Sequence, residues 1–247
     1  MFTPAVVIPV YEHGRAVVSV VQGVLATDLH CIVVDDGSGP ECAHVLDAIA
    51  AEAPARVTLS RRPVNGGKGA AVLHGLARAH ELGFTHAVQI DADGQHDPGD
   101  IAAFVALARD HPAAMIIGRP IFDASVPTSR LYWRRVTHVL VWIHTLSFTI
   151  QDSMCGFRVY PIRPVLDLAD RVALGQRMDF DIEILVRLYW QGLDIVSRPT
   201  QVRYPLDGIS HFRLWWDNML ITRLHVMLFL GMLARLPRLI ARHWSAK

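Results

Sequence analysis

The sequence predicts an α/β domain built on a mostly parallel sheet. Through roughly the first half of the chain, short apolar runs alternate with segments of helical length, a pattern typical of repeated βαβ units. The runs VVIPV, IVVDD and MIIG are rich in valine and isoleucine. Such runs are expected where helices bury both faces of a strand.

The elements can be assigned in order along the chain. In the first half, strands are predicted over residues 5–10, 31–36, 56–61, 87–91 and 114–119, and helices over 14–26, 40–53, 68–82 and 98–109. The second half is less regular. It predicts a long apolar helix over 129–149, a short strand or turn over 156–161, an amphipathic helix over 180–191, one or two strands over 194–205 broken at Pro199, and a helix from about 213 to 240 that Pro237 disturbs.

The composition fits one compact domain with a large core. Of the 247 residues, 51% are hydrophobic and 19% are charged, against about 25% charged in an average soluble domain. A net charge of +1 excludes a strongly basic nucleic-acid-binding surface. The cysteines Cys31, Cys42 and Cys155 are odd in number and lack metal-ligand spacing, so we expect a reduced, cytosolic compartment.

Acidic residues follow two of the predicted strands, where open parallel sheets bind their ligands. Asp91, Asp93 and Gln95 lie in the segment DADGQHDP, and DDGS follows the second strand. Asp93 and Gln95 offer oxygen ligands of the kind that Mg²⁺ or Mn²⁺ takes together with substrate phosphates. The alternative is an acidic turn that exposes its charge to water.

A glycine-rich turn precedes the third predicted helix in RRPVNGGKGAAVLHGLARA. Lys68 and the backbone N–H groups at this helix start could bind phosphate. The spacing of a Walker loop is missing. A tight strand-to-helix connection that needs Gly67 and Gly69 explains the segment equally well.

Taken in order, the segments VVIPVYE, VVDDGS, NGGKGAA, DADGQHDP, DSMCGFRVYP and MDFDIEILVRL resemble the family 2 glycosyltransferases. The similarity is strongest to the polyprenyl-phosphate branch, which is like dolichyl-phosphate mannose synthase. It runs from about residue 4 to 212 and implies the GT-A fold, a Rossmann-like sheet flanked by helices. We therefore assign residues 1–212 to a GT-A domain and 213–247 to a C-terminal amphipathic, basic helical extension.

The resemblance implies roles for particular residues. Asp93 and Gln95 would hold the divalent cation, Mg²⁺ or Mn²⁺. A nucleoside-diphosphate sugar, linked to UDP or GDP, would contact Pro9, Tyr11, Glu12, Asp36, Lys68 and Asp91. The pair Glu12-His13 departs from the Asn-Glu that the family often has, which leaves the first-loop contact open. The QxxRW signature of processive synthases is absent, and GISHFRLWWDN in its place implies inverting transfer of one sugar to a lipid-linked or lipid-like acceptor.

The acceptor determines which further residues are needed. A hydroxyl acceptor requires a general base, for which the candidates are Asp179 and Asp181, with Asp152 behind them. If this segment is helical only one of the acids can point into the site, and a solvated helix N-terminus explains them as well. A polyprenyl phosphate needs no base. Its phosphate would be held by arginines, and the candidate acceptor residues are Arg119, Arg130, Arg134 and His211, unless the arginines form only a basic helix start on the surface.

The C-terminal segment has the composition of a helix lying in a membrane interface. After Asp217 it contains no acidic residue, and its basic residues alternate with apolar ones and tryptophans. We expect peripheral attachment to the cytoplasmic face of a membrane, with homodimer packing and burial in the core as alternatives. Two competing functions remain: a catalytically silent nucleotide-sugar-binding protein, and a sugar-nucleotide pyrophosphorylase, whose glycine-rich N-terminal loop is missing.

Overall fold

A computed structural model describes residues 1–122, 126, 128–203 and 214–245 of the chain. Within these residues, seven strands form one sheet in the order β3-β2-β1-β4-β6-β5-β7. The strands are β1 (Pro4–Val10), β2 (His30–Asp35), β3 (Val57–Arg61), β4 (His86–Gln89), β5 (Met115–Phe122), β6 (Arg158–Pro161) and β7 (Ile195–Val202). All neighbouring strands pair in parallel except β6, which runs antiparallel to both β4 and β5. The predicted mostly parallel α/β sheet is confirmed.

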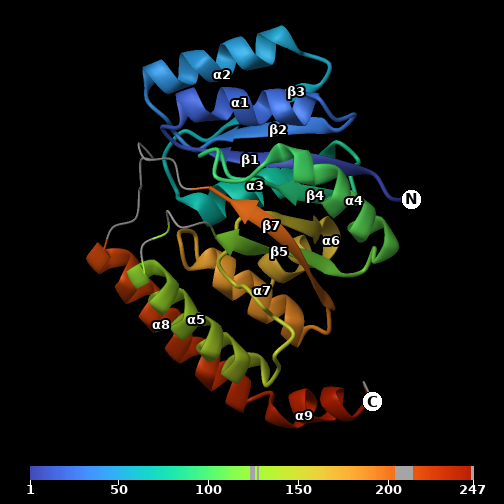
Figure 1. Cartoon of the computed structure of the whole chain (residues 1–247), viewed down its shortest axis with the longest axis vertical. Helices are drawn as coiled ribbons and strands as arrows, with labels where there is room; N and C mark the ends of the chain where they lie inside the picture. Colours follow the sequence, from blue (N-terminus) through green and yellow to red (C-terminus); the bar gives the residue numbers. More distant parts are fainter. Residues whose placement is uncertain (123–125, 127, 204–213, 246–247) are drawn as a thin grey trace.

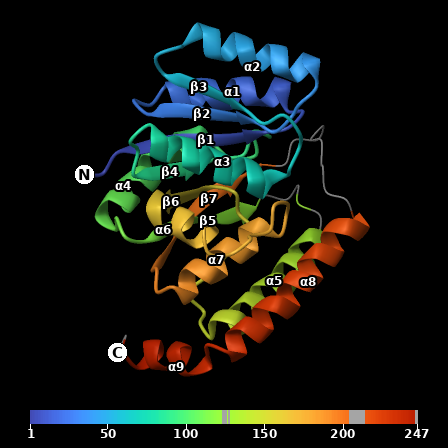
Figure 2. The same cartoon turned by 180° about the vertical axis from the view of Figure 1, so that it is seen from behind.

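Helices cover both faces of this sheet (Figures 1 and 2). Along β1, Val6 and Ile8 face a core formed with α1 (Gly14–Leu25), α2 (Pro40–Glu52) and α4 (Ile101–Asp110), which follows the short 3-10 helix η1 (Pro98–Asp100). Ala5 and Val7 face the opposite core, formed with α3 (Lys68–Glu81), α6 (Ile162–Ala169) and α7 (Phe180–Trp190). Alternate residues of a strand point to opposite faces, so apolar side chains along both faces of β1 bury the strand completely.

Three further helices lie in the described part of the second half of the chain. These are α5 (Thr128–Thr145), α8 (Leu214–Leu233) and α9 (Leu236–Ser245). In both views α5 and α8 lie side by side, and α9 turns away at the far end (Figures 1 and 2). Leu224, Leu228 and Met232 of α8 are buried in the core that contains α7. The C-terminal segment therefore packs on the rest of the protein through one face.

The element predictions hold in the first half and need correction in the second. β7 is one continuous strand, and Pro199 lies in register opposite Arg119. β7 is the last strand of the sheet, where a proline is tolerated, and its bridge to His96 on the outer side is made at Val202 rather than at Pro199. The C-terminal helix breaks before Pro237, which is the second residue of α9, a position where a proline is tolerated. Helix α6 was not predicted, and α5 ends at Thr145 rather than at residue 149.

Two basic residues of the C-terminal segment, Arg235 and Arg242, contact the rest of the protein. Arg242 donates hydrogen bonds to the carbonyl oxygens of Tyr189 and Leu193. The Arg235 guanidinium lies 4.7 Å from the centre of the Trp190 ring. Arg242 of α9 and Arg235, in the turn between α8 and α9, therefore fasten this end of the chain to the end of α7.

The topology brings many chain segments to one edge of the sheet. The carboxyl ends of β1, β2 and β4 lie there, as expected for parallel strands. Because β6 is antiparallel, it is the start of this strand, at Arg158, that lies at the same edge. The N-termini of α3 and α7 also open toward this edge, so that residues far apart in the sequence meet.

Candidate active site

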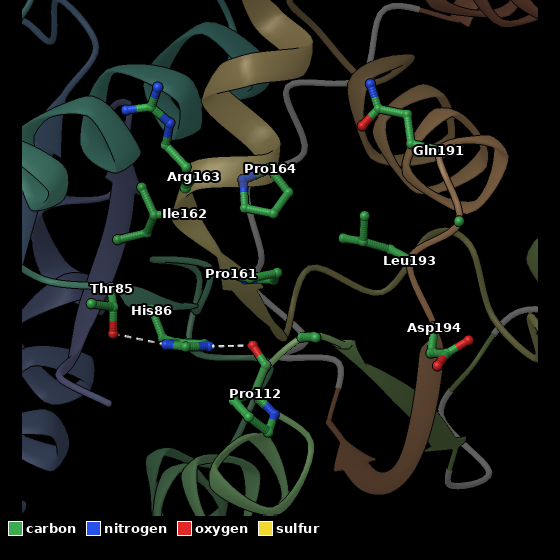
Figure 3. A pocket seen from close by; sticks show the side chains of 12 residues that line it. Thr85, His86, Pro112, Pro161, Ile162, Arg163, Pro164, Gln191, Leu193 and Asp194 are labelled. Atoms are coloured by element: carbon green, nitrogen blue, oxygen red, sulfur yellow. Dashed lines mark hydrogen bonds between the residues drawn. The ribbon is translucent and has the colours of Figure 1, made fainter. Parts of the chain in front are cut away.

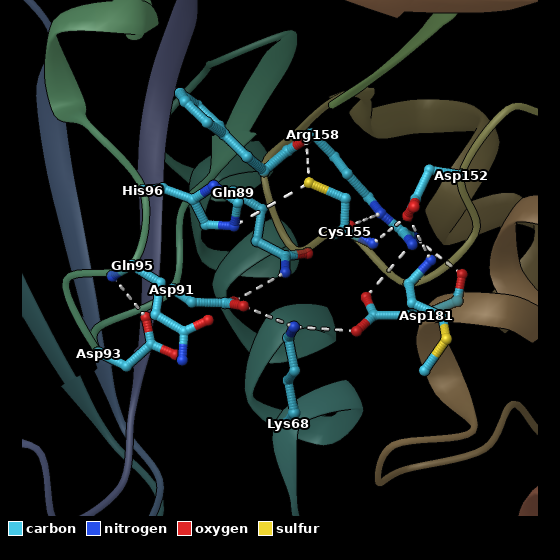
Figure 4. A network of polar contacts seen from close by, with 12 residues as sticks. Lys68, Gln89, Asp91, Asp93, Gln95, His96, Asp152, Cys155, Arg158 and Asp181 are labelled. Atoms are coloured by element: carbon cyan, nitrogen blue, oxygen red, sulfur yellow. Dashed lines mark hydrogen bonds and ion pairs between the residues drawn. The ribbon is translucent and has the colours of Figure 1, made fainter. Parts of the chain in front are cut away.

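The loop after β4 carries the predicted metal ligands. The backbone N–H of Gln95 donates to Asp93 Oδ1 at 3.0 Å, and Gly94 adopts a φ of 72°, which glycine tolerates best. Asp93 and Gln95 thereby lie on one tight turn next to Asp91 (Figure 4). The turn places two oxygen-bearing side chains within reach of the same point.

The environment of Asp93 suits a cation. Burial and the neighbouring charge of Asp91 raise the pKa of Asp93 to about 6. An acidic turn that merely exposed its charge would be well solvated and would keep an ordinary pKa, whereas the Asp93 carboxylate is largely buried and forms no ion pair with any of the described residues. A divalent cation would supply a counter-charge, and two protein oxygens leave its remaining positions for water and phosphate, as Mg²⁺ prefers. The residues present therefore fit the cation that the sequence predicts.

Lys68 lies between two carboxylates rather than open to solvent. Its Nζ is 2.9 Å from Asp91 Oδ2 and 2.9 Å from Asp181 Oδ2 (Figure 4). Burial opposes the charge on Lys68, but Asp181 and Asp91 hold the pKa of its ammonium above the usual value. Burial likewise works against the Asp91 charge, and Lys68 keeps the pKa of that carboxyl low. The structure thus gives Lys68 two carboxylate partners, and its contact with a phosphate stays a prediction.

The close packing here explains the glycines beside Lys68. Gly67 has a φ of 98°, and a side chain at Gly69 would meet Phe180 Cβ at 2.4 Å. The tight connection is therefore a structural requirement, as one of the two sequence interpretations proposed.

Arg158 is a buried residue of the site that sequence reasoning did not single out. Its guanidinium is fully buried and donates to the carbonyl oxygens of Cys155, Ser153 and Asp181. It thereby fastens the loop 152–157 to the start of α7. An arginine in an otherwise apolar strand, within the segment DSMCGFRVYP, was the available signal.

The first two strand ends are tied to neighbouring loops. Asp36 accepts hydrogen bonds from the N–H groups of Gly66 and Gly67, the latter at 2.7 Å, and pairs with Arg62. Glu12 has a φ of 57°, and its carboxylate accepts from the N–H of Gly39 at 2.6 Å. Both acids were expected to face the base and ribose of a nucleotide. In this structure they fix the loops that frame this region, next to Pro9 and the half-buried Tyr11.

The three candidate bases have different surroundings. Asp152 accepts two hydrogen bonds from Arg134, at 2.6 and 2.7 Å, and lies 3.2 Å from His138. Burial works against its charge, but His138 and Arg134 hold the pKa of Asp152 well below its usual range. Asp181 is paired with Lys68 and is the acid of α7 that points into the site.

Asp179 stands at the N-cap of α7 and accepts from the N–H of Arg177 at 3.0 Å. Among the described residues it has no cationic partner. Glu183, two residues after Asp181, turns instead to Arg187 and the N–H of Gly175. The acids of this segment therefore fan apart on the helix, as expected.

The structure does not bring all the predicted acceptor residues together at the site. Arg119 is exposed on β5. Arg134 binds Asp152 instead of standing free at the surface. Arg130 lies in the first turn of α5, but its side chain is outside the described part of the structure, as is His211.

The opposite edge of the sheet carries a hollow of about 460 Å³, lined by Pro112, Pro161 and Leu193 among others. There the His86 imidazole hydrogen-bonds to Pro112 O and Thr85 Oγ1, at 2.9 Å each (Figure 3). Both ring nitrogens of His86 are therefore paired within the protein. The described residues that line the hollow form no cluster of acids or cations.

Comparisons with known proteins agree with this geometry. Residues 5–162 match the family model described as "Glycosyl transferase family 2". The chain is 30% identical over 213 residues to a polyprenol monophosphomannose synthase of Mycolicibacterium smegmatis, with 83% of this chain and 79% of that protein covered. It is 29% identical over 213 residues to a UDP-N-acetylglucosamine–dolichyl-phosphate N-acetylglucosaminyltransferase of Methanococcus voltae, with 80% and 84% covered.

Solved structures show the same fold. A glucosyl-3-phosphoglycerate synthase of Mycobacterium tuberculosis, solved with Mn²⁺, UDP-glucose and glycerol 3-phosphate, matches with a TM-score of 0.65 and 18% identity. The match covers 94% of this chain and 80% of that one. The predicted GT-A fold is thus confirmed, and with the family match it shows that this chain is a glycosyltransferase and belongs to glycosyl transferase family 2.

Proposed function

We propose that this enzyme transfers a single sugar, with inversion, from a nucleoside-diphosphate sugar to a polyprenyl phosphate at the cytoplasmic face of a membrane. A divalent cation, held by Asp93 and Gln95, would neutralise the charge that grows on the departing diphosphate. The relatives named for polyprenol and dolichyl phosphate support the acceptor class. The Mn²⁺ and UDP-glucose bound by the mycobacterial neighbour support the donor and the cation.

The pairing of Asp152 and Asp181 with cations is the observation that favours a phosphate acceptor. A general base must accept a proton, and a carboxylate held by Arg134 or Lys68 is a poor proton acceptor. A phosphate oxygen is already ionised and needs no base. It attacks the anomeric carbon, the new C–O bond forms, and the bond from that carbon to the diphosphate breaks with its electron pair.

An exposed apolar surface on α5 and α8 supports attachment to a membrane. Trp215 of α8 is 89% exposed, and Val226, Phe229 and Leu230 of the same helix and Trp133 of α5 are each at least 44% exposed. Monomeric soluble proteins rarely expose apolar patches of this kind. Arg223 of α8 and Arg238 of α9 are also exposed, and such positive charge favours anionic lipid.

No single helix among the described residues has both the length and the hydropathy of a membrane span. The bent pair Trp215–Leu233 and Leu236–Arg242, at 75° to one another, meets those criteria only together. An interfacial placement would use the exposed apolar side chains of α8 without requiring a span. The alternative occupant of this surface is a second copy of the chain.

Transfer is tested with UDP- and GDP-linked sugars, Mn²⁺ and a polyprenyl phosphate, by following released nucleoside diphosphate and the glycolipid. The wild type should produce both in equal amounts, and Asp93→Asn should lose at least about a hundredfold in rate. Release of pyrophosphate would indicate nucleotidyl transfer. Nucleotide binding without either product would indicate a silent binding protein, and both results would overturn the proposal.

Membrane attachment is tested separately by co-sedimentation with vesicles that contain anionic lipid. Trp215→Ser combined with Phe229→Ser should lower the bound fraction. Leu82→Ser, which replaces an apolar residue 40% exposed on another surface, should not. If the double variant binds vesicles like the wild type, or if it converts a dimer to a monomer in solution, the membrane assignment of this surface is wrong.

A further inference from the structure

Buried and half-buried polar side chains connect four elements beside the candidate metal site (Figure 4). The Gln89 amide of β4 donates to Asp91 Oδ1 at 3.3 Å, and Lys68 of α3 pairs with Asp91 Oδ2 at 2.9 Å. Lys68 continues to Asp181 of α7, whose other carboxylate oxygen lies 3.5 Å from the Arg158 guanidinium of β6. The Lys68 ammonium is the central member, because it joins the two halves of this network.

We propose that Lys68 is a positioning residue that fixes Asp91 against Asp181, and that its charge keeps the affinity of the substrate-free site for a divalent cation low. This inference rests on the proposed function and adds an order of binding to it. The cation would enter together with the nucleoside diphosphate rather than before it.

The charge balance of the site supports this order. Asp91, Asp93 and Asp181 carry negative charge, and Lys68 and Arg158 offset two of the three. The Lys68 side chain is only 16% exposed, so water screens its repulsion of a cation poorly. A neutral side chain at this position would remove that repulsion and strengthen binding of a free divalent cation on the order of tenfold. A diphosphate supplies both oxygen ligands and negative charge, which lets the cation bind despite Lys68.

The positioning role predicts an opposite effect on turnover. Both Asp91 oxygens are engaged, one by Lys68 and one by Gln89. Without the ammonium, the buried Asp91 and Asp181 carboxylates repel one another and shift. Loss of Lys68 should therefore tighten cation binding while it slows transfer. A protein that was merely destabilised would lose both properties.

The test measures Mn²⁺ affinity from the electron paramagnetic resonance signal of the free ion, with and without UDP or GDP. The variants are Lys68→Met, Lys68→Arg and the double variant Lys68→Met with Asp181→Asn, each checked for folding by circular dichroism. Without nucleotide, Lys68→Met should bind Mn²⁺ about tenfold more tightly than the wild type. Lys68→Arg keeps the charge and the double variant restores the balance, so both should return toward the wild-type affinity.

The outcomes separate this inference from the proposed function. If nucleotide promotes Mn²⁺ binding to the wild type but Lys68→Met binds the free ion no more tightly, the role of Lys68 is refuted and the proposed function stands. If the double variant binds Mn²⁺ as tightly as Lys68→Met, the effect does not come from charge and the inference also fails. If neither nucleotide promotes Mn²⁺ binding to the wild type, the proposed function falls and the inference falls with it.

Discussion

Gly156 gives the sharpest structural test of the site, because no side chain fits there. A Cβ atom at this position would lie 2.0 Å from Asp91 Oδ2, while real Cβ atoms keep at least 3.0 Å from other heavy atoms. In Gly156→Ala the carboxylate must therefore retreat by about 1 Å. It is held by Lys68 and Gln89 and cannot move without breaking those contacts.

The expected loss of activity follows from this displacement. A misplacement of about 1 Å in a catalytic arrangement costs on the order of a hundredfold in rate. The added methyl group should also lower the free energy of unfolding by about 1–3 kcal/mol, the usual cost of overpacking. Gly156 does not have a positive φ, so alanine introduces no backbone strain. The assay is sugar transfer to polyprenyl phosphate, with urea unfolding measured in parallel.

Gly192→Ala is the matched control. Gly192 has a φ of 98°, and a Cβ there would meet no atom within 4 Å. This variant should lose about 1 kcal/mol of stability from the left-handed conformation and keep wild-type transfer. If Gly156→Ala retains a third or more of the activity, or loses no more than Gly192→Ala does, the assigned importance of the Asp91 position is refuted.

The remaining predictions concern other parts of the molecule. Asp179→Asn should change kcat by about threefold at most with a phosphate acceptor, because an ionised phosphate needs no general base. If Asp179 were a general base, the same assay would show a loss of about 10²- to 10⁴-fold. Arg158→Met should lower the free energy of unfolding in urea by about 3–5 kcal/mol, since it leaves buried partners unpaired. Burial, and then the nearby His225, lower the pKa of His144 to about 4. The unfolded state therefore binds a proton at His144 more readily than the folded state. The free energy of unfolding should fall as pH drops from about 6.5 toward 4, and it should fall less steeply in His144→Gln.

Local sequence patterns predicted the first half of the fold well and the second half less well. Continuous apolar strands and their intervening helices are short-range signals, and β1 to β5 lie close to their predicted bounds. The antiparallel direction of β6 depends on which strands it meets, and neither its length nor its composition encodes that. Pro199 was misjudged for a related reason, because a proline interrupts a central strand but not the edge strand that β7 proves to be.

The site shows the same division between local and long-range information. Asp93 and Gln95 were identifiable because they share one turn. The partners of Lys68 were not, because Asp181 lies more than a hundred residues away and reaches Lys68 only through the packing of α7 on α3. Arg134 was a candidate for phosphate binding, and in the structure it pairs with Asp152. The sequence does not reveal this pairing, because an arginine that pairs with a distant acid and one exposed at a helix start have the same local sequence pattern.

The buried ion pairs also bear on why a glycosyltransferase would carry so many charges in its interior. Breaking such a pair is costly, whereas replacing both partners by apolar residues is often neutral or even stabilising. Lys68 with Asp181, and Arg134 with Asp152, are thus poorly explained as devices for stability alone. Asp181 of α7 pairs with Lys68 of α3, and Asp152, in the loop before β6, pairs with Arg134 of α5. Each pair thus joins two separate segments of the chain. The two ion pairs are better explained if the enzyme must hold fixed charges beside the reacting phosphates. Preorganised charge at that place lowers the activation barrier of the transfer most.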